Sequence, residues 1–124
     1  MEQPRIHRTE RDVTKQNKVF VYIGDTIASK VEFDIDFCSI TWVRTREEYR
    51  NRGLARLALG DAIDWIKSSG KCSRVSLTIA PQENTEYGKL LKFYKEFGFR
   101  PDTFTDWIKT KRHRPCKLSA DITE

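Results

Sequence analysis

The chain has 124 residues, and its 23 Lys and Arg against 18 Asp and Glu give a formal net charge of +5 at pH 7. That length predicts one domain, residues 1–124, able to bury a core without a disulfide or metal. No apolar run reaches the roughly 18 residues of a membrane span. Five bases and no acid lie within residues 109–117, and the rest of the chain is charge-balanced. This distribution argues against a nucleic-acid-binding surface spread over the whole domain.

The cysteines are three in number and widely spaced, at Cys38, Cys72 and Cys116, and the chain has only two histidines. We therefore expect neither a disulfide framework nor a metal site. None of the three cysteines is expected to be a nucleophile. Reduced thiols, together with an N-terminus that has no apolar signal segment, predict a cytoplasmic protein.

The first half of the chain reads mainly as strands. Residues 1–17 are polar and predict an arm or a weak edge strand. Residues 19–23 are β-branched and aromatic, and a turn signal at Gly24 follows them. Residues 31–37 alternate apolar side chains with Glu32, Asp34 and Asp36, which predicts a strand with an acidic face. A third strand over 38–43 should follow a tight hairpin around Asp36.

The second half alternates helices and strands. Apolar side chains at helical spacing over 54–66 predict a helix with Gly70 as its C-terminal cap. Residues 75–79 predict a strand that Pro81 ends, and Asn84 or Thr85 should cap a helix that runs to Gly98. A last strand is expected over 104–109, followed by a flexible basic tail over 110–124. The order predicts an α/β (α+β) fold with a mixed, mostly antiparallel twisted sheet and flanking helices.

The segment Arg50-Asn51-Arg52-Gly53-Leu54-Ala55-Arg56 joins a strand to an amphipathic helix. A helix N-terminus presents unpaired N–H groups and about half a positive charge. A glycine there allows the backbone to approach a phosphate closely, and the arginines add positive charge. The segment predicts an anion site suited to a pyrophosphate; an ordinary turn with solvated arginines is the alternative.

The pattern R-x-x-G-x-A at the start of a helix resembles the acetyl-CoA pyrophosphate loop of the GNAT acetyltransferase superfamily. A second segment, Leu90-Leu91-Lys92-Phe93-Tyr94-Lys95-Glu96-Phe97-Gly98-Phe99, resembles the helix end of that family. The two motifs occur in the family's order, with one strand between them. The resemblance covers residues 18–99 and implies a GNAT-like fold.

The resemblance also implies an activity: acetyl transfer from acetyl-CoA to an amine by direct attack, without a metal. Tyr94 matches the tyrosine that protonates the departing thiolate, and a core aromatic is its structural alternative. Val43 matches the strand position that pairs with the pantetheine arm. Backbone N–H groups of the loop would hold the pyrophosphate; these are on Arg50, Asn51, Arg52, Gly53, Leu54, Ala55 and Arg56.

Three departures from the family pattern stand out. Tyr87 occupies a position where members often carry an asparagine that contacts the cofactor. The connection from Val43 to Arg50 is about two residues longer than usual. Only 17 residues precede the first clear strand, where the family has a strand and two helices that wall the acceptor site. An open acceptor site would favour a large substrate, a homodimer partner that completes it, or loss of catalysis.

The sequence constrains the identity of the general base less than any other role in the site. Glu32 and Asp34, with Asp36, share one predicted strand face and would attract a cationic amine or accept its proton. Glu47 and Glu48 lie at the loop entrance, and a solvated acidic face is the alternative.

The excess of positive charge leaves a second function open. A non-catalytic GNAT-like module would use the basic tail to contact nucleic acid or an acidic protein. A solvated terminus without function is the alternative for this tail.

Overall fold

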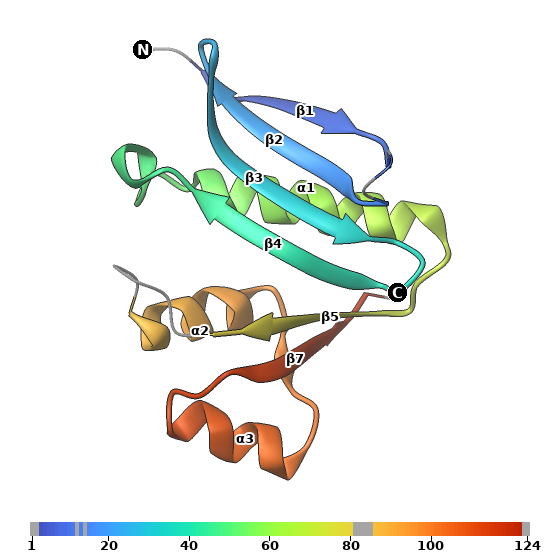
Figure 1. Cartoon of the computed structure of the whole chain (residues 1–124), viewed down its shortest axis with the longest axis vertical. Coiled ribbons are helices and arrows are strands. Elements are labelled where there is room, and N and C mark those ends of the chain that lie inside the picture. Colours follow the sequence, from blue (N-terminus) through green and yellow to red (C-terminus); the bar gives the residue numbers. More distant parts are fainter. Residues whose placement is uncertain (1–2, 12, 14, 81–85, 123–124) are drawn as a thin grey trace. The chain divides into compact units, whose positions relative to one another are not determined.

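The computed structural model describes residues 3–11, 13, 15–80 and 86–122. The N-terminal part of the chain forms an antiparallel sheet. Its strands pair in chain order (Figure 1): β1 (Arg5–Thr9), β2 (Asn17–Ile23), β3 (Thr26–Asp34) and β4 (Ser39–Thr45). A short 3₁₀ turn, η1 (Glu47–Tyr49), and the helix α1 (Leu54–Ser69) follow. These elements belong to one unit, residues 1–72, and residues 73–124 form another. Each unit is described by itself.

The helix α1 covers one face of the strands β2 to β4 (Figure 1). The fully buried strand side chains Val19, Val31 and Phe33 alternate with more exposed ones, as a strand with one covered face requires. The Phe33 ring meets the Trp65 ring of α1 edge to face, with 5.1 Å between centroids. The helix adds a buried stripe at helical spacing, made by Leu54, Ala58, Leu59, Ala62 and Ile66. The predicted helix is confirmed, with Gly70 in the left-handed conformation at its end. The predicted strands are confirmed, except that β3 ends at Asp34 instead of continuing to residue 37.

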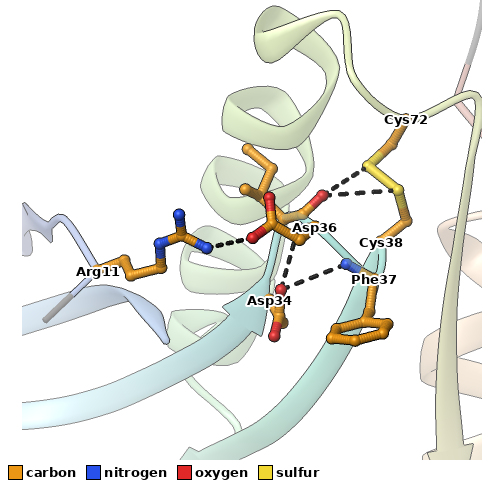
Figure 2. A network of polar contacts seen from close by, with 7 residues as sticks. Arg11, Asp34, Asp36, Phe37, Cys38 and Cys72 are labelled. Carbon is orange, nitrogen blue, oxygen red and sulfur yellow. Dashed lines mark hydrogen bonds and ion pairs between the residues drawn. A yellow bond between two sulfur atoms is a disulfide. The ribbon is translucent and has the colours of Figure 1, made fainter. Parts of the chain in front are cut away.

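The β3–β4 turn is held by its own polar groups and by a disulfide (Figure 2). Asp34 accepts hydrogen bonds from the N–H groups of Asp36 and Phe37, at 2.9 and 3.3 Å. Cys38, which has a positive φ of 52°, is bonded to Cys72, just after α1. The expectation of reduced thiols is therefore wrong for these two cysteines, and it no longer supports a reducing compartment. Only the fold brings them together, because 34 positions separate them in the sequence.

The second unit places a strand from the end of the chain at the centre of its sheet. It contains β5 (Arg74–Ile79), α2 (Tyr87–Glu96), β6 (Arg100–Pro101), α3 (Phe104–Lys111) and β7 (Cys116–Asp121). The strand β7 pairs antiparallel with β5 on one side and β6 on the other. The predicted strand over 75–79 and the helix before Gly98 are confirmed. The expected roles of Pro81, Asn84 and Thr85 lie outside the described residues.

Two expectations for the end of the chain are wrong. Residues 104–111 form the helix α3 rather than a strand, because Thr103 caps it: its hydroxyl accepts from the Asp106 N–H at 3.1 Å and donates to the Asp106 carboxylate at 3.0 Å. The tail is not flexible throughout, since residues 116–121 form β7 and bury Leu118 and Ala120.

The start of the chain forms an edge strand, one of the two alternatives expected. Within β1, Arg8 makes a two-point ion pair with Asp61 of α1, at 2.8 and 3.0 Å, and its guanidinium lies over the Trp65 ring. Residues 10–16 lead from β1 to β2. A seven-residue connection is too short for the two helices that the family resemblance implies in this part of the chain.

Candidate functional site

The loop before α1 is shaped by the 3₁₀ turn. The N–H of Tyr49 donates to the Arg46 carbonyl at 2.9 Å, and the N–H of Arg50 donates to the Glu47 carbonyl at 3.2 Å. This turn lies within the connection from Val43 to Arg50, which is expected from the sequence to be longer than usual. The Arg50 Nε then donates to the Thr45 carbonyl at 3.3 Å, which fixes the half-buried arginine against the end of β4.

The backbone adopts the left-handed conformation twice before the helix begins. Asn51 has φ 65°, and Gly53, the N-cap of α1, has φ 78° and ψ 10°. Left-handed residues of this kind produce the concave backbone of anion-binding loops. No side chain caps the helix, and the first N–H groups of an α-helix have no hydrogen-bond partner within the helix itself. A Cβ added at Gly53 would meet open space.

The charged side chains within residues 50–56 are all positive. The first turn of α1 contains no acidic residue. Arg52 and Arg56 are exposed, and the Arg52 guanidinium lies 5.5 Å from the centre of the Tyr49 ring. Because the helix N-terminus is itself positive, the loop residues 50–56 combine backbone donors with cationic side chains. We call these residues the cradle; they suit a doubly charged phosphate group.

A cavity of about 570 Å³ lies in the first unit beside the start of η1. Phe20 and Ile27 contribute apolar surface to it, while Lys30, Arg44, Arg46, Glu47 and Glu48 contribute charge. This cavity could not be predicted from the sequence, because it depends on strand register: Phe20 lies opposite Lys30, and Lys30 lies opposite Arg44. Val43 directly precedes Arg44, which lines the cavity. It is half-buried on β4 and lies opposite Val31.

The predicted acidic row does not act as one group. Glu32 is part of β3 and its carboxylate lies 3.3 Å from the Lys30 ammonium. Asp34 ends β3 and caps the turn, whereas Asp36 belongs to the turn and pairs with Arg11, which lowers the pKa of Asp36 (Figure 2). Among these three, Glu32 is the one that projects from within the strand.

Tyr94 belongs to the second unit, on α2, and is 5% exposed. Its ring contacts Phe93 and Phe99 edge to face, with centroids 5.3 and 6.1 Å away. Burial raises the pKa of Tyr94 to about 12. The phenol therefore keeps its proton throughout the neutral range, as a proton donor must.

Tyr87 has a structural role at the start of α2. Its hydroxyl donates to the Arg114 carbonyl at 2.7 Å, and its ring stacks on His113 with centroids 4.8 Å apart. The Cys116 sulfur lies 3.7 Å from the same hydroxyl. Burial raises the pKa of the Cys116 thiol, which disfavours the nucleophilic thiolate.

No cluster of three or more His, Cys, Asp or Glu suited to a metal ion occurs in the described part of the chain. None of the helices described has the length and apolar character needed to span a bilayer.

The family model for the acetyltransferase (GNAT) family matches residues 6–99, which include the cradle and Tyr94. The chain belongs to the GNAT acetyltransferase family. This confirms the resemblance drawn from the two motifs. A search of curated protein sequences finds no match.

Solved structures confirm the GNAT fold. The ribosomal-protein-S18-alanine N-acetyltransferase from Escherichia coli superimposes with a TM-score of 0.69 at 15% identity, over 91% of this chain and 73% of that one. The IAA acetyltransferase from Bacillus cereus gives 0.69 at 13% identity, over 96% and 99%. The PaiA N-acetyltransferase from Thermoplasma acidophilum, solved with coenzyme A, gives 0.64 at 16% identity, over 84% and 59%. The expected fold class, an α+β GNAT-like fold with mostly antiparallel strands, is therefore confirmed.

Proposed function

We propose that this GNAT acetyltransferase moves an acetyl group from acetyl-CoA to an amine by direct attack. The observation that carries the proposal is the cradle: a left-handed Gly53 at an uncapped helix N-terminus, flanked by arginines, in a family that uses acetyl-CoA. The backbone N–H groups of residues 50–56 would hold the pyrophosphate. The backbone of Val43, near the end of β4, would pair with the pantetheine arm.

During the reaction, protons leave the amine nitrogen and one proton reaches the departing sulfur. The amine must be neutral to attack, and a lysine-like amine with a pKa near ~10.4 is mostly charged at pH 7. Glu32 is our candidate to attract it and to accept its proton, directly or through water; Asp34 is the weaker candidate, because its carboxylate already caps the turn. The amine nitrogen then bonds to the thioester carbon and loses a further proton to water, the carbon–sulfur bond breaks, and Tyr94 gives its proton to the thiolate and recovers one from solvent.

We infer that the acceptor is large. The seven residues between β1 and β2 are too few for the two helices that wall the acceptor site in the family, which favours a protein amine or a second copy of the chain that completes the site. The same observation favours the second candidate function, a binding module that retains the fold without catalysis. Turnover of acetyl-CoA with a panel of amines separates the two, because the module would bind the cofactor and release no free thiol.

Binding of acetyl-CoA is the first expected result. Calorimetric titration should show saturable one-to-one binding, competed by coenzyme A and weakened by salt because the contacts are ionic. A flat titration at millimolar ligand would contradict the proposal.

Replacing Tyr94 with phenylalanine should lower kcat by about 10²-fold while the affinity for acetyl-CoA stays the same, since general acid catalysis contributes about that much. Because the pKa of Tyr94 is about 12, the wild-type rate should show no decline from Tyr94 ionisation below about pH 11. Tyr87→Phe is the matched control: it removes a buried hydroxyl from the same helix and should lower stability but not kcat. Equal rates for Tyr94→Phe and wild type would remove Tyr94 from the mechanism.

A further inference from the structure

The helix α3 exposes two aromatic side chains that contribute little to the core. Phe104 is 72% exposed and Trp107 is 47% exposed. Their rings stack, with centroids 5.7 Å apart and planes 17° from parallel, because positions three apart are neighbours on a helix. The ammonium of Lys111, four residues further on, lies 5.3 Å from the centre of the Trp107 ring. Stacked aromatic faces open to solvent are uncommon unless they contact a partner.

A basic cluster continues directly from this aromatic pair. Lys111, Arg112 and Arg114 are exposed, and no ion pair joins them to any residue that the structure describes. The nearby acids are engaged elsewhere: Asp106 holds the helix N-terminus with Thr103, and Asp102 pairs with Arg74 and Lys117. Cations in the last turn of a helix interact favourably with its dipole, but this interaction does not explain why the aromatic rings are exposed.

We propose that Phe104, Trp107, Lys111, Arg112 and Arg114 form a surface that binds single-stranded nucleic acid. Unpaired bases would stack on the aromatic pair, and the cations would contact the phosphates. The flat, nearly parallel rings favour this partner over an acidic protein, whose carboxylates have no face to stack. They also favour it over a duplex, whose bases are already stacked. The surface lies within the second unit and does not depend on acetyl transfer.

The test is fluorescence anisotropy of the full chain with labelled 20-nucleotide oligo(dT) and oligo(U). We expect saturable binding at 50 mM salt that weakens on going to 200 mM, with a log–log slope of about −2 for three phosphate contacts. Phe104→Ala/Trp107→Ala should weaken binding about tenfold or more. Trp107→Phe keeps an aromatic face and should stay within about twofold of wild type, which separates lost stacking from misfolding.

Two matched controls come from the same chain. Phe37→Ala removes an aromatic ring that is 79% exposed but lies in the first unit, and it should not change the affinity. The surface variant is Lys111→Gln/Arg112→Gln/Arg114→Gln, and the control variant, which removes the same charge elsewhere, is Lys71→Gln/Lys89→Gln/Lys92→Gln. Only the surface variant should reduce the dependence of the affinity on salt concentration.

Several results would overturn the proposal. These are the absence of saturable binding at 50 mM salt, aromatic variants that bind as wild type, and duplex DNA or poly-glutamate that competes as well as the single strand. Binding to anionic phospholipid vesicles with no binding to the oligonucleotides would assign the surface to a membrane instead.

Discussion

Replacing Gly53 with alanine should weaken acetyl-CoA binding about tenfold, which corresponds to ~1.4 kcal/mol. Gly53 holds φ 78°, where a side chain costs about 1–2 kcal/mol of backbone strain. The chain can relieve this strain only by rotating the peptide units whose N–H groups would face the pyrophosphate. The added Cβ also enters the open space beside the cradle, where a ligand has to approach the backbone.

Gly70 provides the matched control for this substitution. It is located at the other end of α1, with φ 69° and ψ 4°, and a Cβ there also meets nothing within 4 Å. Gly70→Ala should therefore lower the stability of the fold by a similar ~1 kcal/mol and leave acetyl-CoA affinity unchanged. Calorimetry and denaturant unfolding of both variants measure the two effects separately. If both variants lost affinity equally, the cradle would have no special role in binding.

Removing the Cys38–Cys72 disulfide should lower the free energy of unfolding by about 3–4 kcal/mol. The bond joins residues 34 positions apart, and closing a loop of that length restricts the unfolded chain by about this amount. The variant Cys38→Ser/Cys72→Ser, compared with wild type in urea, gives the value directly. A fall in Tm of roughly 10–15 °C should accompany it.

A reductant supplies the control, because it should destabilise wild type as much as the double substitution does and should leave the double variant unchanged. Thiol titration of the denatured, unreduced protein should count one reactive cysteine, Cys116. Three reactive thiols under those conditions would contradict the bond.

Local patterns predicted the parts of the fold whose causes are local. The alternation around Val31 and Phe33 identified β3, and Gly70 after an apolar stripe identified the C-terminal end of α1. The Cys38–Cys72 bond depends instead on where a turn and a helix end meet in space. The helix α3 was misread as a strand because Phe104 and Trp107 are exposed, so they do not follow a buried stripe. Its signal was Thr103 with Asp106 three residues later, a capping pair.

The candidate site shows the same division. The cradle was predicted from contiguous residues, because a loop and the start of a helix are set by their own sequence. The prediction of an acidic row is wrong at Asp36, because β3 ends at Asp34 and the Asp36 side chain pairs with Arg11. The cavity beside η1 depends on residues from three strands, and no single segment contains its pattern.

The disulfide also determines how tension is transmitted along the chain and which fragments a protease cut releases. The cradle and all of α1 lie between Cys38 and Cys72, inside a covalently closed ring. Tension applied at the two ends of the chain passes through the sulfur–sulfur bond and bypasses that ring. A trypsin cut after Arg50, Arg52 or Arg56 would open the ring but leave a single covalent molecule, and the fragments would separate only after reduction.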